Sequence, residues 1–377
     1  MRRDFNRIAL AGLVVVIGLL AVGTALAQQK QGPVVNSPEV LSDGKVVFRI
    51  LAPKAEKVAL NASDIQGLPR GGPQFTKGEN GVWEATIGPI DPGAYRYTFL
   101  VDEVSVVDPR NPSVSESNNN VWSLVYVPGA KFMEAAKVPH GAVAEISYYS
   151  TALGRNRRMH IYTPPAYETG QVKYPVFYLL HGAMDCDDSW STVGRAGYIL
   201  DNLIAEKKAK PMIVVMPSGW TPSGGQVMTS DATKDPFTAE MIKDIIPFIE
   251  ANYRVVANPE NRALSGLSMG GIQTLNIGLH HLGTFRYVAV MSSGWISDTD
   301  REFFYKAEEA QIPKYNSELK LFWWGWGETD IARANGLAVI GKFRSAGVKI
   351  ETMETPGGHE WANWRLYLHE VAPKLFR

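Results

Sequence analysis

The stretch ALSGLSMGGIQ, residues 263–273, places a serine at the junction of two kinds of secondary structure. It begins as an apolar, strand-like segment and continues as the start of a helix. Ser268 lies at the junction, with Gly266 before it and Gly270 after it, which is the G-x-S-x-G pattern of a nucleophile elbow. In that turn the chain bends so tightly that the flanking positions cannot carry large side chains. The pattern therefore predicts that Ser268 presents its hydroxyl at the carboxyl end of a buried sheet.

The sequence around this stretch, residues 143–377, alternates between buried strands and helices. YPVFYLLHG (174–182) and KPMIVVMPSG (210–219) are apolar runs, and each is followed by a segment with helical periodicity. Continuous apolar strands that alternate with helices indicate a mostly parallel sheet covered on both faces. Together with the elbow, this order predicts an α/β-hydrolase domain.

The earlier part of the chain follows a different period. KVVFRILAP (45–53) and YRYTFLVD (95–102) alternate apolar and polar residues, and turn sequences such as DPG separate such runs. This pattern predicts a small all-β, immunoglobulin-like sandwich at residues 33–127, joined by a linker at 128–142 to the hydrolase domain. The aromatic side chains Trp83, Tyr95 and Tyr97 share the alternation, so we expect them in the core of the sandwich rather than in a platform that binds sugars.

A serine hydroxyl needs a base to remove its proton, and the base needs an acid to orient it. In α/β-hydrolases both follow the serine along the chain, each just after a late strand. LFWWGWGETD ends at Asp330, and METPGGHEW contains His359. We therefore expect His359 to act as general base and then acid, and Asp330 to hold its ring. Glu328 competes with Asp330 for that role.

The oxyanion hole of this fold uses two backbone N–H groups. One comes from the residue after the nucleophile, here Met269, and the other from the loop after the first buried strand, here Ala183 or Met184. In that loop we expect His181 to brace the backbone rather than to react, and Asp188 to cap the following helix.

Composition excludes several classes of function. The 377 residues carry 38 basic and 38 acidic side chains, so nothing in the charge balance favours a nucleic acid or an anionic membrane as partner. Cys186 is the single cysteine, which precludes an internal disulfide, and we expect it to be a packing residue. The seven histidines show no paired metal-ligand spacing. We therefore expect neither a metal nor a cofactor.

The amino-terminal residues 1–27 have the pattern of a signal peptide. A basic start leads into the apolar run IALAGLVVVIGLLAVG, and ALA precedes Gln28 as a cleavage signal. Arg2 and Arg3, followed by Phe5, resemble a twin-arginine export signal, and ordinary secretion is the alternative route. An uncleaved membrane anchor is the other interpretation of the same residues. The pattern predicts a periplasmic or extracellular protein that has no membrane contact once the signal is removed.

The motifs YPVFYLLHG, NRALSGLSMGG and GGHEW resemble those of the esterase D-like branch of the α/β-hydrolases. The resemblance covers about residues 143–377 and is greatest to the carbohydrate esterases that include feruloyl esterases and some acetylxylan esterases. LAPKAEKVAL, GVWEATI and GAYRYTFLVD are similar to the early-set, immunoglobulin-like module, of carbohydrate-binding type, that precedes glycogen-branching and debranching domains.

The resemblance implies a secreted serine carboxylesterase that releases feruloyl or other hydroxycinnamoyl groups from plant cell-wall polysaccharide through an acyl-enzyme. Ser268, Asp330 and His359 would form its triad. Trp220 and Trp295, which follow two strands, would line an aromatic acyl pocket or would only anchor their loops. Its partner would be a polysaccharide-linked or small-molecule ester, and no sequence feature fixes an oligomeric state. The alternatives are an acetylxylan esterase, a siderophore esterase of the enterochelin type, or a non-catalytic glycan-binding protein on a hydrolase scaffold.

Overall fold

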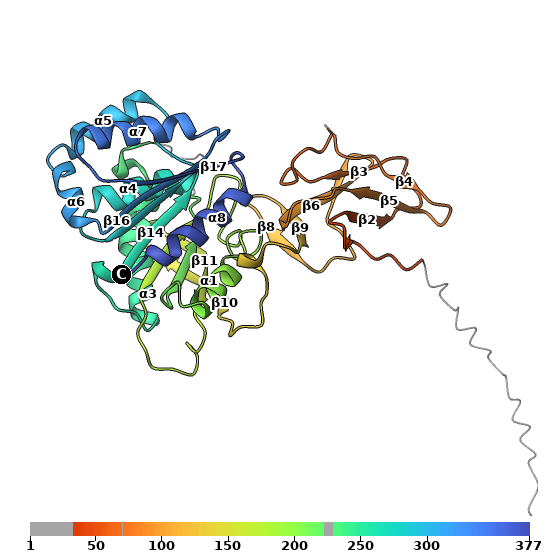
Figure 1. The fold of residues 1–377 in the computed structure, drawn as a ribbon, viewed down its shortest axis with the longest axis horizontal. Coiled ribbons are helices and arrows are strands. Elements are labelled where there is room, and N and C mark those ends of the chain that lie inside the picture. The colour runs from red at the N-terminus through yellow and green to blue at the C-terminus, as the bar shows by residue number, and fades with distance from the viewer. Residues whose placement is uncertain (1–32, 70, 222–228) are drawn as a thin grey trace, which may run out of the picture. The chain divides into compact units, whose positions relative to one another are not determined.

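The computed structural model describes residues 33–69, 71–221 and 229–377, and the expected signal peptide lies outside these ranges. Within them the chain forms a sandwich of antiparallel strands followed by a larger α/β domain (Figure 1). The predicted α/β fold of the larger part and the all-β character of the first part are thereby confirmed.

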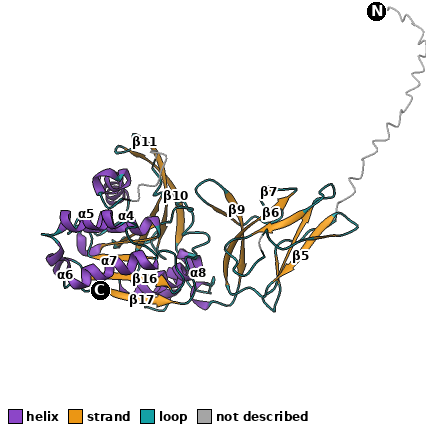
Figure 2. Cartoon of the chain, turned by 90° about the horizontal axis from the view of Figure 1, so that it is seen from above, coloured by secondary structure: helices purple, strands orange, loops and turns teal. Residues whose placement is uncertain are grey.

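The sandwich consists of two sheets in which all strand pairs are antiparallel. Figure 2 shows it as strands joined by loops. In sheet order, the first sheet is β1 (Glu39–Val40), β2 (Val46–Leu51), β5 (Val82–Ile87) and β4 (Thr76–Lys77), and the second is β3 (Val58–Asn61), β6 (Gly93–Val101), β9 (Val121–Val127) and β8 (Val114–Glu116), with β7 (Val104–Val106) beside β6.

Alternate residues of these strands point inward and form one core between the two sheets. Phe48 of β2 and Tyr97 of β6 pack edge to face, with ring centres 4.7 Å apart. Trp83, Tyr95 and Tyr97 are all buried, which confirms their predicted place in the core. The period-two pattern thus identified the inward face of β2 and β6 correctly.

The α/β domain is built on an eight-stranded sheet in the order β10-β11-β13-β12-β14-β15-β16-β17. β10 and β11 pair antiparallel, β11 also pairs antiparallel with β13, and the strands from β13 to β17 run parallel. The strands are β10 (Ala142–Ser150), β11 (Arg155–Thr163), β12 (Val176–Leu180), β13 (Ile213–Pro217), β14 (Arg262–Leu267), β15 (Tyr287–Met291), β16 (Leu321–Gly327) and β17 (Glu351–Thr355).

Helices cover both faces of this sheet, and each face has its own hydrophobic core (Figure 1). The helices are α1 (Ala196–Ala205), α2 (Pro236–Glu240), α3 (Ile246–Asn252), α4 (Met269–His280), α5 (Asp298–Glu308), α6 (Tyr315–Glu318), α7 (Arg333–Ser345) and α8 (Trp361–Val371). Short 3-10 turns occur at Lys131–Met133, Ala232–Lys234, Pro259–Asn261, Ile312–Lys314 and Ala372–Lys374. α1 and α8 contribute to the core on one face, whereas α3, α4 and α7 contribute to the other.

The segment between the two parts, residues 128–142, is packed against the α/β domain. Its 3-10 turn places Met133 in the core that contains α1 and α8. Arg195 donates from Nε to the carbonyl oxygen of Met133 at 2.8 Å. The predicted linker is therefore anchored to the domain that follows it.

Candidate active site

The turn at Ser268 has the geometry that the sequence predicts. β14 ends at Leu267 and α4 begins at Met269, so Ser268 alone makes the turn, with φ 52° and ψ −117°. A Cβ atom at Gly266 would lie 2.3 Å from the carbonyl oxygen of Gly270, and a Cβ at Gly270 would lie 2.5 Å from that of His181. Both flanking positions therefore require glycine, because a side chain at either would displace backbone.

Three side chains from three loops meet at this turn. His359 Nε2 lies 2.9 Å from Ser268 Oγ, and His359 Nδ1 lies 2.9 Å from Asp330 Oδ1. Asp330 follows β16, and His359 follows β17. An Nδ1–H that donates to the carboxylate leaves Nε2 free to accept the serine proton. The chain order and spacing thus bring together the serine, histidine and aspartate that the sequence singled out.

The buried carboxylate of Asp330 stays ionised near neutral pH. Burial by itself raises its pKa, but the hydrogen bond with His359, the nearby Ser292 hydroxyl and the N–H of Ala332 outweigh burial and hold the pKa below its ordinary value. Glu328, the competing acid, is exposed, and its backbone N–H bonds the carbonyl of Thr355. Asp330 is therefore the carboxylate that contacts the histidine.

The backbone beside Ser268 offers hydrogen-bond donors for an oxyanion. A Cβ atom at Gly182 would lie 3.4 Å from the Cβ of Ser268, so the loop after β12 runs directly against the serine. In the described part of the chain, the backbone N–H groups of Ala183, Met184 and Met269 donate no hydrogen bond. The N-terminus of α4 also directs its positive end toward the same place. These donors are thus available to a developing negative charge.

His181 braces the loop, as expected. Its ring is buried, with Nδ1 2.7 Å from the carbonyl oxygen of Gly182, and Nε2 accepts from the N–H of Gly219 at 2.8 Å. Burial lowers the pKa of His181, which favours the neutral ring that this pair of contacts requires. Gln273 donates from Nε2 to the carbonyl of the same Gly219.

The structure separates the two tryptophans that the sequence placed in an acyl pocket. Trp295 is completely buried, donates from Nε1 to Asn276 Oδ1 at 3.0 Å and packs on Phe304. It therefore has no surface to offer a ligand in this conformation. Trp220 is partly exposed and donates from Nε1 to the carbonyl oxygen of Asp185, so it lies beside the loop that runs against Ser268.

Asp188 has a different role from the one expected. The N-cap position of α1 is Arg195, and no side chain caps that helix. Asp188 instead accepts hydrogen bonds from the Glu116 backbone N–H at 2.7 Å and from the Thr192 hydroxyl at 3.0 Å. Its carboxylate thus joins the loop after β12 to the sandwich, because Glu116 belongs to β8.

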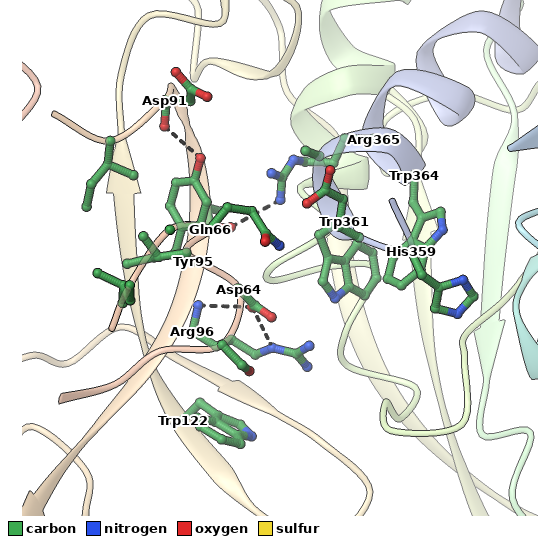
Figure 3. Close-up of a pocket in the computed structure, with 18 of the residues that line it drawn as sticks. Asp64, Gln66, Asp91, Tyr95, Arg96, Trp122, His359, Trp361, Trp364 and Arg365 are labelled. Carbon is green, nitrogen blue, oxygen red and sulfur yellow. Dashed lines mark hydrogen bonds and ion pairs between the residues drawn. The ribbon is translucent and has the colours of Figure 1, made fainter. Parts of the chain in front are cut away.

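A cleft that the sequence did not indicate lies next to His359. The cleft has a volume of about 790 Å³ and is bordered by the sandwich and by the start of α8. In Figure 3 the side chains of Gln66, Tyr95 and Arg96 face Trp361 and His359 across it. Trp122 of β9 also lines it. Local sequence placed Tyr95 in the core of the sandwich and gave no sign of the cleft, because the cleft is formed by segments far apart in the chain.

Cys186 takes no part in the triad. Cys186 is buried, and burial raises the pKa of its thiol to about 12, so the thiol stays protonated. Among the described residues, no group of three or more His, Cys, Asp or Glu side chains is arranged to hold a metal ion. Within the same ranges, no helix has the length and apolar character needed to cross a bilayer.

Comparison with known proteins gives one family and a consistent set of relatives. The Esterase family model matches residues 150–375. An endo-1,4-beta-xylanase/feruloyl esterase of Xylanibacter ruminicola is 33% identical over 351 residues, which cover 90% of this chain and 46% of that protein. Esterase Rv1288 of Mycobacterium tuberculosis is 32% identical over 142 residues, which cover 37% of this chain and 29% of that protein. The chain thus spans less than half the length of either curated relative.

Solved structures share the fold. The feruloyl esterase module of Clostridium thermocellum in complex with sinapinate has a TM-score of 0.57 at 20% identity and covers 66% of this chain and 93% of its own. The ferulic acid esterase of Anaeromyces mucronatus has a TM-score of 0.55 at 25% identity, with 66% and 96% covered. The enterobactin esterase of Shigella flexneri has a TM-score of 0.60 at 19% identity, and its likeness covers 95% of this chain and 99% of that one.

Proposed function

Because the chain belongs to the Esterase family of ester hydrolases, we propose that it is a serine carboxylesterase that releases feruloyl or related hydroxycinnamoyl groups from plant cell-wall polysaccharide. The observation that carries this proposal is the hydrogen-bonded series from Ser268 Oγ through His359 to Asp330. A nucleophile, a base and an acid in that order are what acyl transfer requires.

The reaction would proceed in two halves. Ser268 Oγ attacks the ester carbonyl while His359 Nε2 takes the hydroxyl proton, and the resulting oxyanion accepts hydrogen bonds from Met269 and from Ala183 or Met184. Collapse of this intermediate breaks the bond to the alcohol, which receives the proton from His359, and leaves an acyl-serine. His359 then removes a proton from water, and attack by the hydroxide releases the carboxylic acid and restores Ser268.

The cleft beside His359 is an argument that the alcohol part of the ester substrate is a sugar. His359 protonates the leaving alcohol, so this part of the substrate must lie on the same side as the histidine. A volume of about 790 Å³ has room for more than a methyl or ethyl group. Its lining combines aromatic side chains such as Trp122 and Tyr95 with polar ones such as Gln66, a mixture suited to sugar rings and their hydroxyls.

An aromatic acyl group is supported by the relative named as a feruloyl esterase and by Trp220. The partly exposed indole of Trp220 lies beside the oxyanion donors, where the acyl chain would enter. Burying an aromatic ring contributes about 2 kcal/mol, or roughly a thirtyfold preference over an acetyl group when it is realised in the transition state.

A substrate panel tests the proposal. Hydrolysis of p-nitrophenyl acetate establishes esterase activity, and kcat/KM is then compared for methyl ferulate, a feruloylated arabinoxylan fragment, acetylated xylan and a cyclic catecholate ester. We expect the feruloyl esters to be the best substrates. A preference for acetylated xylan or for the catecholate ester would replace the proposed substrate while keeping the mechanism, and inactivity on every ester would favour a binding protein.

A further inference from the structure

The loop that contains Ala183 and Met184, the two candidates for the second oxyanion donor, is held by the sandwich as well as by its own domain. We call residues 182–191 the oxyanion loop. Arg96 of β6 donates from Nη1 to Asp185 Oδ1 at 2.8 Å, and the backbone N–H of Asn118 donates to the carbonyl oxygen of Met184 at 3.3 Å. Consecutive residues of this loop are therefore fixed from outside the α/β domain, next to the peptides expected to bind the oxyanion.

The ion pair at Asp185 is largely shielded from water. The side chains of Arg96 and Asp185 are 11% and 5% exposed, and Arg96 also donates from Nε to Asp64 Oδ2 at 3.1 Å. Removing one member of such a pair leaves the other charge without compensation, so the loop would have to move to rehydrate it. The guanidinium also lies 5.9 Å from the ring centre of Trp361, two residues after His359.

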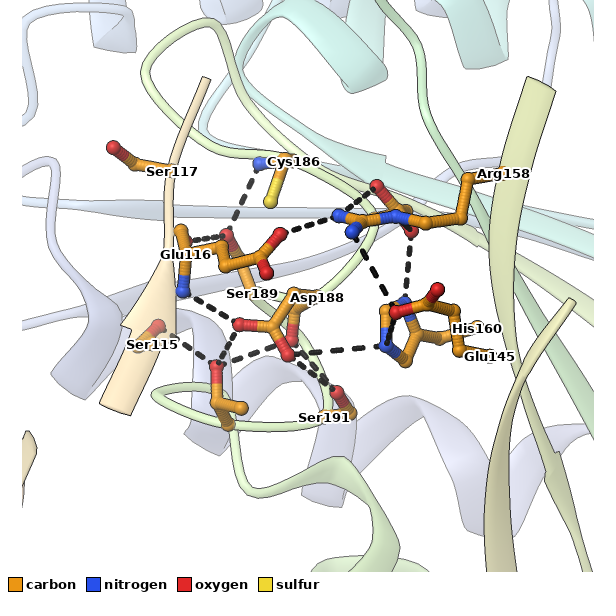
Figure 4. Close-up of polar contacts among 12 residues, drawn as sticks. Ser115, Glu116, Ser117, Glu145, Arg158, His160, Cys186, Asp188, Ser189 and Ser191 are labelled. Atoms are coloured by element: carbon orange, nitrogen blue, oxygen red, sulfur yellow. Dashed lines mark hydrogen bonds and ion pairs between the residues drawn. The ribbon is translucent and has the colours of Figure 1, made fainter. Parts of the chain in front are cut away.

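The β8–β9 hairpin provides a second attachment farther along the loop (Figure 4). The Glu116 backbone N–H bonds Asp188 Oδ2 at 2.7 Å, and Ser189 Oγ donates to the Glu116 carbonyl at 3.3 Å. Arg158 of β11 donates hydrogen bonds to both Glu116 and Asp187, so the hairpin and the oxyanion loop are bridged by a guanidinium group of the α/β domain. The contacts therefore extend over the length of the oxyanion loop.

We propose that the sandwich is a positioning element of the oxyanion hole, in which Arg96 and the β8–β9 hairpin set the backbone of Ala183–Asp185 against Ser268. The proposal rests on the esterase function proposed above. An oxyanion hole acts only when its donors are fixed where the charge develops, and a misplacement of about 1 Å can cost about a hundredfold in rate. The sandwich is thus part of the catalytic apparatus, whatever sugar contacts it also makes.

The test compares Arg96→Met with Arg49→Met in the full-length protein. Arg49 is a matched control because it lies in the same sandwich and also pairs with two carboxylates, Glu39 and Glu84. For methyl ferulate we expect Arg96→Met to lower kcat about 10- to 100-fold with little change in KM, because the hole contacts the transition state. Arg49→Met should keep the wild-type kcat, and Arg96→Lys should lie between Arg96→Met and wild type.

Inhibitors separate positioning from a general loss of structure. An aryl trifluoromethyl ketone forms a tetrahedral oxyanion on the serine, whereas ferulate mimics only the ground state. In Arg96→Met the inhibition constant of the ketone should rise by the same factor as kcat/KM falls, and that of ferulate should stay the same. An Arg96→Met enzyme with wild-type kcat, or with only a raised KM, would overturn the proposal. A wild-type protein without esterase activity would instead refute the proposed function.

A second variant keeps the test decisive if Arg96→Met does not fold. Asn118→Pro removes the N–H that bonds the Met184 carbonyl from an exposed position, whereas Asn118→Ala keeps it. We expect Asn118→Pro to show the same loss of kcat and of ketone affinity, and Asn118→Ala to retain more activity. Equal kcat in the two variants would contradict the positioning role of the hairpin.

Discussion

At the scale of single residues, the site depends on two hydrogen bonds made by one imidazole. His359 bonds Ser268 Oγ and Asp330 Oδ1 at 2.9 Å each, and no other carboxylate described in the structure contacts its ring. Ser268 is the nucleophile and Asp330 orients the ring, so substitutions of these two residues should lower activity for different reasons.

Replacing the nucleophile should abolish turnover without unfolding the protein. We expect Ser268→Ala to lower kcat by about five to six orders of magnitude, as loss of a nucleophilic serine does elsewhere. A fluorophosphonate probe should label the wild type at Ser268 and leave the variant unlabelled, with circular dichroism confirming the fold. Labelling of another serine in the variant would disprove the assignment.

Replacing the acid should disturb the tautomer of the histidine. Asp330→Asn is expected to reduce kcat by about 10⁴, because an amide favours the wrong tautomer. Glu328→Gln is the matched control, since Glu328 is exposed and only two residues away. The two kcat values, compared with that of wild type, show which carboxylate orients His359. A larger loss in Glu328→Gln would assign this role to Glu328 instead of Asp330.

The two tryptophans should report on different properties. Trp220→Ala is expected to lower the ratio of kcat/KM for methyl ferulate over a matched acetyl ester by up to about thirtyfold, through loss of an aromatic wall. Trp295→Ala should instead destabilise the fold by about 3–5 kcal/mol, because it opens a cavity in the core. Steady-state kinetics and urea denaturation measure the two effects. A Trp220→Ala enzyme with an unchanged ratio would place the acyl pocket elsewhere.

At the scale of elements, the oxyanion loop is stabilised by a polar cluster on its outer side (Figure 4). His160 of β11 lies with Nδ1 2.8 Å from Asp187 Oδ2, and its ring also faces Asp188, Glu145 and Arg158. Burial lowers the pKa of His160, but the contacts with Asp187 outweigh burial and raise the pKa above its ordinary value. For Asp187, burial is outweighed by His160 and Arg158, which lower its pKa to about 2.

The His160 contact should therefore make stability depend on pH. With a folded pKa above the unfolded value of about 6.5, the charged histidine stabilises the fold fully below pH 6.5, and this is lost as pH rises through the folded pKa. The loss of stability caused by His160→Gln should thus be greatest at pH 6 and should become smaller toward pH 9. His369 is the control, because burial and Lys208 lower its pKa, so His369→Gln should show the opposite slope. Urea titrations of both variants and of wild type at several pH values measure these differences in stability. A difference between His160→Gln and wild type that does not change with pH would contradict the raised pKa of His160.

Elements also show where sequence patterns suffice and where they do not. The strand–turn–helix at Ser268 and the two late strands could be predicted, because each signal lies within about ten residues of chain. The cleft and the Arg96–Asp185 pair could not, since the two residues are 89 positions apart and the motifs in which they lie give no sign that they meet. Trp295 follows a strand as predicted, but its burial depends on Phe304 of α5, which local sequence does not indicate.

At the scale of the whole molecule, the expected signal peptide makes a prediction about the mature chain. Cleavage after the ALA of residues 25–27 should give a protein that begins at Gln28 and lies outside the cytoplasm. Amino-terminal sequencing of the exported protein, together with cell fractionation, measures this directly. Recovery of the chain from Met1 in the membrane fraction would support the anchor instead.

The backbone at Ser268 has a consequence for how such a protein is maintained over generations. A φ of 52° with a ψ of −117° suits glycine, which adopts it freely, whereas any residue with a Cβ atom is strained there. Selection for stability alone would therefore favour glycine at this position, because glycine relieves the backbone strain. Serine at this turn lowers the stability of the fold, and it is retained because turnover requires its hydroxyl.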